Sequence, residues 1–233
     1  MIELWKNLFF VRKCLLCGEI LTESKEGVFC PKCRLEYEKL KRRPCRACGK
    51  PQSACGCMPD KLKHEIAWAV HLFAYDDPLS KTVIFTLKRR DFKPLQVFLG
   101  EELASLFGDI AEYEITFAPR KPKSVREYGF DQAEALARVI SDEKNVPLAD
   151  IFTHARRSEL QKNLNAEARA ENAEKSYALQ RSFTREREKL IIVDDVMPTG
   201  STMAKLVSLA NEAGYKEIAT VCVARTVHEM ETR

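Results

Sequence analysis

Apolar residues along the chain form short runs that alternate between strand spacing and helix spacing. Dense apolar runs predict strands at residues 66–75, 114–118, 190–193 and 217–224. Apolar residues three and four positions apart predict helices at residues 79–87, 94–107, 131–144 and 201–213. Because strands alternate with helices, we expect an α/β fold: an open, mainly parallel sheet with helices on both faces.

Two stretches lack this pattern. Residues 14–59 are rich in Gly, Pro and Cys, with too few large apolar residues for a core of their own. Residues 155–175 are polar and charged, with helix-forming residues but no apolar stripe, and we expect a mobile arm there. No run approaches the roughly 18 apolar residues of a membrane span, and we see no signal peptide. We therefore expect a soluble, cytoplasmic protein.

Eight of the nine cysteines lie in the first of these stretches. They form four close pairs: Cys14 and Cys17, Cys30 and Cys33, Cys45 and Cys48, Cys55 and Cys57. Such pairs grip a tetrahedral zinc ion from tight turns, and Gly18 follows the first pair where a positive φ is needed. We predict two zinc sites of four cysteines each, in sequential order. The alternatives are cross-braced pairing, an empty site, and reduced structural thiols or a redox pair. Four thiolates leave zinc no open position, so these ions are expected to be structural.

The net charge of +4 is unevenly divided along the chain. Residues 1–63 hold 14 Lys and Arg against 7 Asp and Glu, and the remaining residues hold 24 against 27. Part of the N-terminal excess is a basic run of Lys39, Lys41, Arg42, Arg43 and Arg46. This run is either a solvated face or a contact for the phosphate backbone of a nucleic acid. Phe29 and Tyr37 are candidates to stack on bases, or to pack against the zinc sites.

The most informative motif follows the strand predicted at residues 190–193. It contains Asp194, Asp195, Thr199, Gly200, Ser201 and Thr202. Two carboxylates at a strand end can accept hydrogen bonds from ribose hydroxyls, and a turn into a helix can bind phosphate through backbone N–H groups and small hydroxyls. The simpler alternative is a strand end followed by a helix cap. The motif lacks the lysine of a Walker A loop.

These residues resemble the diphosphate-sugar motif of type I phosphoribosyltransferases, with Pro198 in place of the first threonine. Two more stretches resemble the ComF family of competence proteins: the proline-led basic loop at 119–133, and the Gln, Leu, Arg, Asn and aromatic pattern at 157–177. Tyr75 and Lys88 match the family's tyrosine and the lysine that closes its first helix. The chain is thereby identified as a ComF-family member. The resemblance implies a double zinc ribbon at 1–63 and a type I phosphoribosyltransferase-like domain at 64–233.

The resemblance also implies a ligand, phosphoribosyl pyrophosphate with Mg²⁺. Its expected binding residues, beyond the acidic motif, are Lys88, Lys121, Lys123, Arg126 and Gly129. The cations can neutralise a diphosphate, and Gly129 permits close approach of the backbone. Gln161 and Arg169 in the polar arm are expected to close over the site as a hood, with a solvated helix as the alternative.

Three functions fit these features. The first is a competence factor that binds the activated sugar and handles single-stranded DNA, with the ATPase of the DNA-uptake machinery as a partner that the resemblance implies. The second is an active phosphoribosyltransferase on a nitrogenous small molecule. The third is a nucleic-acid-binding module with a vestigial pocket, as the absence of one N–H and one hydroxyl at Pro198 suggests. We assign no catalytic residue, because the sequence offers no general base.

Overall fold

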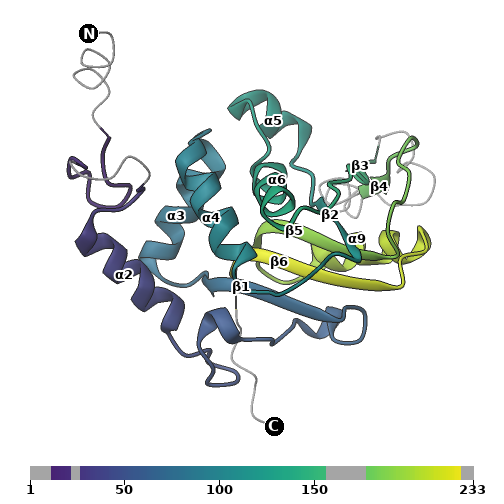
Figure 1. Cartoon of the computed structure of the whole chain (residues 1–233), viewed down its shortest axis with the longest axis horizontal. Helices are drawn as coiled ribbons and strands as arrows, with labels where there is room; N and C mark the ends of the chain where they lie inside the picture. Colours follow the sequence, from purple (N-terminus) through teal and green to yellow (C-terminus); the bar gives the residue numbers. More distant parts are fainter. Residues whose placement is uncertain (1–11, 22–26, 156–176, 227–233) are drawn as a thin grey trace, which may run out of the picture.

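A four-stranded parallel sheet forms the centre of the protein (Figure 1). The computed structural model describes residues 12–21, 27–155 and 177–226. The strands lie in the order β1-β6-β5-β2, with bounds β1 Trp68–Ala74, β2 Tyr113–Phe117, β5 Lys189–Met197 and β6 Glu217–Arg225. The middle strands β5 and β6 are almost entirely buried, as the dense apolar runs in their sequences require.

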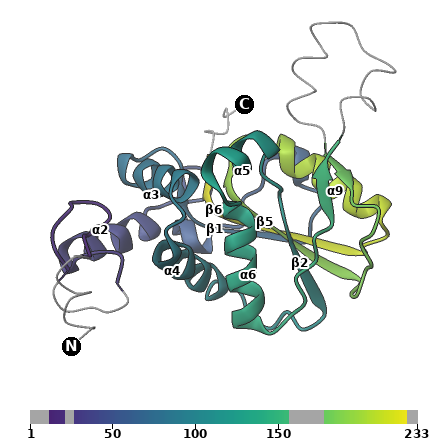
Figure 2. The same cartoon turned by 90° about the horizontal axis from the view of Figure 1, so that it is seen from above.

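Helices cover both faces of this sheet, which confirms the predicted α/β fold. One face packs against α3 (Pro78–Arg89), α4 (Lys93–Ala104) and α6 (Gln132–Lys144), which lie side by side in Figure 2. The other face packs against α9 (Ser201–Glu212) and a short 3-10 helix, η2 (Asp60–Leu62). Successive side chains of β5 point to opposite faces of the sheet. Ile191 and Val193 therefore pack in the core on the first face, and Leu190 and Ile192 in the core on the second.

Local signals explain where two of these helices begin. The Asp131 side chain accepts hydrogen bonds from the backbone N–H groups of Ala133 and Glu134, and so caps α6. Asp77 caps α3 in the same way, through the N–H group of Leu79.

Three elements differ from the expectation. The first part of the predicted basic loop at 119–133 forms a helix, α5 (Pro122–Tyr128), with proline at its start and Gly129 (φ 82°) at its end. Strand β5 continues to Met197, so both acids lie within it. An unpredicted antiparallel pair, β3 (Phe152–His154) and β4 (Tyr177–Leu179), flanks the predicted arm. Strands of three residues are too short for a periodicity.

The cysteine-rich segment contains the helix α2 (Pro31–Arg42) and a short 3-10 helix, η1 (Gln52–Ala54). The described residues of this segment form no core of their own. Phe29 and Tyr37 are buried against Phe98 of α4 and Phe73 of β1, and they belong to the same apolar cluster as α3 and α4. The idea that Tyr37 stacks on nucleic-acid bases is therefore wrong, because the side chain is 0% exposed.

Candidate functional site

The eight clustered cysteines form two groups. Cys14, Cys17, Cys30 and Cys33 make up the first cluster, and Cys45, Cys48, Cys55 and Cys57 the second. Within each cluster all four sulfur atoms lie within 4.8 Å of one another. Four Zn–S bonds of about 2.3 Å in a tetrahedron place sulfur atoms about 3.8 Å apart. The Sγ atoms of Cys17 and Cys30 are 3.7 Å apart, and those of Cys48 and Cys55 are 3.6 Å apart. The clusters therefore fit two structural zinc sites, in the sequential pairing that the sequence predicted.

The two clusters are built on the same backbone turn. Gly18 donates a hydrogen bond to the carbonyl of Cys14, and Gly49 donates to that of Cys45. Both glycines have positive φ, 75° and 71°, as this turn requires. Because the turn brings successive cysteine side chains to one point, each CxxC pair supplies half of a tetrahedron.

In the central sheet, β5 carries the two acids of the predicted sugar site. Asp195 is 3% exposed, and its carboxylate lies 3.3 Å from the Lys88 ammonium and 3.4 Å from the Gln132 amide nitrogen. Asp194 accepts a hydrogen bond of 2.7 Å from the backbone N–H of Asp195. Strand β5 thus holds both acids beside one lysine.

Burial and the neighbouring Asp195 carboxylate raise the pKa of Asp194 well above its usual range. Lys88 offsets only part of this effect. A bound cation, or hydroxyl groups that donate hydrogen bonds to the carboxylate, would favour the charged form.

Two further residues belong to this part of the site, and the sequence analysis did not assign either of them. Gln132 Oε1 is buried and has no hydrogen-bond partner among the described residues. Arg120 donates hydrogen bonds to the carbonyls of Lys88 and Phe130, and so ties the end of α3 to the loop that precedes α6. Both residues lie in the basic stretch at 119–133, and this was the only sequence signal for a role in the site. Their contacts with other elements depend on the fold.

The turn from β5 into α9, residues 198–202, is the predicted phosphate loop. Gly200 has a φ of 73°, and the hydroxyls of Thr199 and Ser201 are 3.2 Å apart. Thr202 lies beside Tyr177 of β4. Backbone N–H groups at the start of the 12-residue helix α9 add donors for an anion.

The remaining predicted cations lie on or before α5. Lys121 precedes this helix, and Lys123 and Arg126 are exposed on it. Gly129 ends the helix, two residues before the half-buried cap residue Asp131. Their contact with a diphosphate stays a prediction.

Strands β3 and β4 lie next to the phosphate loop. His154 and Tyr177 stack with ring centroids 4.7 Å apart. Burial and the nearby charge of Asp194 raise the pKa of Tyr177 to about 12, so its hydroxyl stays protonated. The predicted hood residues Gln161 and Arg169 lie outside the described residues.

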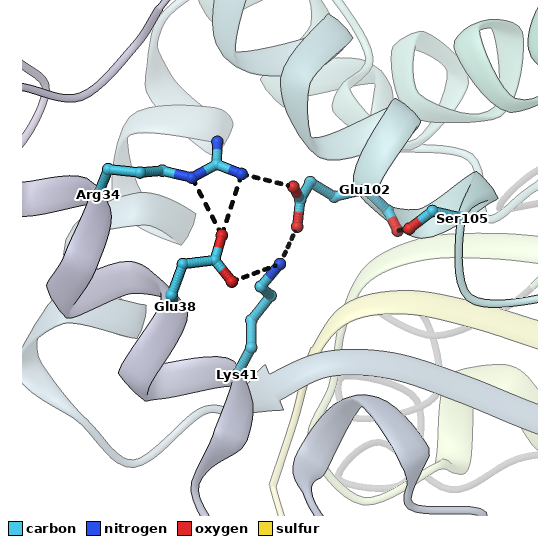
Figure 3. A network of polar contacts seen from close by, with 5 residues as sticks. All are labelled: Arg34, Glu38, Lys41, Glu102 and Ser105. Atoms are coloured by element: carbon cyan, nitrogen blue, oxygen red, sulfur yellow. Dashed lines mark hydrogen bonds and ion pairs between the residues drawn. The ribbon is translucent and has the colours of Figure 1, made fainter. Parts of the chain in front are cut away.

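The basic run of α2 is largely paired with carboxylates of the same chain. Figure 3 shows Arg34 and Lys41 of α2 bound to Glu38 and to Glu102 of α4. Lys39 pairs with Glu36.

Farther along the run, Arg43 pairs with Asp77 and Arg46 with Asp76. Arg42 is exposed at the end of α2. Pairing with carboxylates weakens the case for phosphate contact at most of these positions, and the contact stays a prediction.

A groove of about 580 Å³ lies between the first cysteine cluster and the helices α3 and α4. Its charged lining residues are Arg12, Lys13, Arg89 and Arg90. Within the described ranges none of these four pairs with a carboxylate. Phe85, 59% exposed, also lines the groove, with the Arg89 guanidinium 4.6 Å from its ring centre.

Comparisons with known proteins agree with both parts of this architecture. Residues 5–64 match the double zinc ribbon domain family, and residues 124–232 match the phosphoribosyl transferase domain family. Competence protein ComFC of Streptococcus pneumoniae is 24% identical over 230 residues, covering 91% of this chain and 100% of the relative. Competence protein F of Haemophilus influenzae is 27% identical over 237 residues, covering 93% and 98%.

Two solved structures share weaker similarity. Phosphoribosylpyrophosphate synthetase from Mycobacterium smegmatis is 20% identical, with a TM-score of 0.32; the match covers 57% of this chain and about a third (32%) of that protein. Purine phosphoribosyltransferase from Pyrococcus horikoshii is 17% identical, with a TM-score of 0.32, covering 59% and 75%. In the parts of the chain that the structure describes, no helix is long and apolar enough to cross a membrane.

Proposed function

This chain belongs to the ComF family of competence proteins, and we propose that it binds phosphoribosyl pyrophosphate with Mg²⁺ and handles incoming single-stranded DNA in the cytoplasm. The observation that carries the sugar part is the acidic pair on β5 with Lys88 beside it. These groups lie at the carboxyl end of a parallel strand, where α/β proteins bind phosphorylated ligands.

The unpartnered Gln132 Oε1 supports a polar ligand at this position. A buried acceptor without a hydrogen bond is unfavourable by about 1–3 kcal/mol. A ribose hydroxyl or an ordered water would satisfy it. Asp195 then accepts from the sugar while Lys88 and Gln132 fix the orientation of its carboxylate.

The residues present also fit Mg²⁺ with its ligand. This ion is commonly held by one or two carboxylates together with substrate phosphates and waters, rather than by a full protein cage. Asp194 and Asp195 are the carboxylates that would face it, and its charge would favour the ionised form of Asp194.

Phosphoribosyl transfer to a nitrogenous acceptor is the alternative function. It is favoured by the match to the phosphoribosyl transferase domain family over residues 124–232. Among the described residues, His71 is buried against Gln52 and His154 lies against the carbonyl of Pro119, so neither is placed as a general base. Detection of pyrophosphate release with a defined acceptor would favour transfer over binding alone.

Calorimetric titration with phosphoribosyl pyrophosphate and Mg²⁺ tests the sugar part. We expect saturable heat with the wild type and at least 10-fold weaker binding in the Asp194→Ala/Asp195→Ala variant, because this variant has neither carboxylate to accept hydrogen bonds from the sugar. Asp142→Ala, on the exposed face of α6, is the control and should bind normally. Absence of wild-type heat would refute the proposal.

The DNA part has its best structural support in the groove between the first cysteine cluster and α3. Cations in the groove can neutralise phosphates, and an exposed aromatic ring offers a stacking surface for a base. We therefore expect Arg89→Gln/Arg90→Gln to lower the salt dependence of single-stranded DNA binding by about 1.4 in log–log slope, near 0.7 for each phosphate that the protein no longer neutralises.

The matched comparison is Arg42→Gln/Arg43→Gln in the basic run at the end of α2. Arg43 is already paired with Asp77, so this pair should change the slope by less. An unchanged slope in the groove variant would reject DNA contact there, and a larger change in the second variant would move the contact to α2.

A further inference from the structure

The segment between the second cysteine cluster and β1 lies directly on the phosphate loop. The Lys61 ammonium donates a hydrogen bond of 2.9 Å to the Ser201 hydroxyl. The ring of Pro59 lies so close to Gly200 that a Cβ atom there would stand 3.0 Å from it. The loop is therefore formed by two segments about 140 residues apart in the sequence, and only one of them carries the recognisable motif.

This segment is firmly attached at both ends. Leu62 is 0% exposed and packs in the same apolar cluster as Met203 and Leu206 of α9. On the other side, only three residues separate Lys61 from Cys57 of the second cluster.

The second cluster is itself anchored to the sheet. Gln52 Oε1 lies 3.0 Å from His71 Nε2 on β1, and the buried Arg225 of β6 contacts the sulfur of Cys55. Arg225 Nη1 is buried without a partner among the described residues, which is consistent with a guanidinium that faces a negatively charged zinc–thiolate group. The second cluster, Lys61 and the phosphate loop thus form one connected unit.

We propose that Lys61 binds the phosphate monoester of the sugar in this loop, and that zinc in the second cluster holds Lys61 in place. This inference rests on the proposed function and adds a ligand residue that lies outside the transferase motif. Pro198 removes one N–H donor and one hydroxyl from the loop, and a lysine ammonium replaces them with a charge-assisted donor. When phosphate binds, the ammonium turns from the Ser201 hydroxyl to the phosphate oxygens.

The neighbouring lysine provides a matched control. Lys63 is two residues away, but it pairs with Asp60 at 2.7 Å, and no contact joins it to the loop among the described residues. We expect Lys61→Ala to bind ribose 5-phosphate about 10-fold more weakly in calorimetry, as the removal of one charged hydrogen bond predicts, and Lys63→Ala to bind it normally. Affinity for pyrophosphate, which has no sugar phosphate, should not change.

The outcomes separate this inference from the proposed function. Equal binding of ribose 5-phosphate by Lys61→Ala and wild type would overturn only the role of Lys61. The proposed function would survive this result if the wild type binds phosphoribosyl pyrophosphate and the Asp194→Ala/Asp195→Ala variant does not. A wild type that binds neither ribose 5-phosphate nor phosphoribosyl pyrophosphate overturns both.

The two cysteine clusters allow a matched test of the zinc link. Cys48 and Cys17 are exposed cysteines at equivalent positions of the two turns. Cys48→Ser should weaken ribose 5-phosphate binding, and Cys17→Ser should not, when each variant retains the circular dichroism of the wild type and loses one zinc by metal analysis. Equal effects of the two substitutions would reject the link.

Discussion

At the scale of residues, Asp194 and Asp195 are neighbours on β5 that meet different surroundings. Asp195 is fixed by Lys88 and Gln132, whereas Asp194 is half-buried beside a like charge. Such a pair is unfavourable in the free protein, and the proposed ligand or its metal ion would relieve the repulsion. The acids were predictable because Asp-Asp after an apolar strand is a local signal. Arg120 and Gln132 were not assigned, because their partners lie on other elements.

Asp194→Asn tests this view through stability. The folded-state pKa of Asp194 is raised, so between its ordinary and its raised pKa the folded state binds more protons than the unfolded state. Stability of the free protein therefore falls as pH rises through that window. We expect Asp194→Asn to raise the melting temperature at pH 7 by a few degrees, on the order of 1 kcal/mol, and to abolish sugar binding. The gain should disappear at acid pH, and a lower melting temperature at pH 7 would contradict the assignment.

At the scale of elements, helices and strands with long apolar patterns were found close to their predicted positions, and short or cysteine-rich ones were not. Helix α2 has only Tyr37 and Leu40 buried, and its other face carries charges, so its sequence lacks an apolar stripe. The position of α2 depends on contacts with α4, whose residues are distant from α2 in the sequence. The predicted nucleic-acid role of Lys41 overlooked these contacts, because sequence spacing does not reveal that Glu102 faces it.

The ion-pair network between α2 and α4 gives an element-scale prediction. Glu102 is the partner of both Arg34 and Lys41 and is 16% exposed, so Glu102→Gln leaves two cations to share Glu38 (Figure 3). We expect the free energy of unfolding to fall by about 1–2 kcal/mol in chemical denaturation. Glu101→Gln, the exposed neighbour on α4, should change stability by under about 0.5 kcal/mol. Equal decreases would mean that the network does not hold the two helices together.

At the scale of the whole molecule, the zinc-binding segment and the sheet domain share their packing. Phe29 and Tyr37 lie in the core of α3 and α4, and Leu62 lies in the core of α9. The predicted domain boundary between residues 63 and 64 stays a prediction. Side chains from both sides of this boundary pack in the same apolar clusters. Two features therefore hold the cysteine-rich segment together: its packing against helices of the sheet domain, and the two cysteine clusters.

The sequence by itself determined the α/β class, the eight zinc-ligating cysteines and the acidic motif at 194–202, because each is encoded by residues close together in the chain. Only the tertiary structure decided the sequential pairing of the cysteines, the carboxylate partners of the basic run and the position of Lys61 on the phosphate loop. These contacts join residues of distant segments. The spacing of residues along the chain does not predict these contacts, because they arise from the packing of helices and strands around a common sheet.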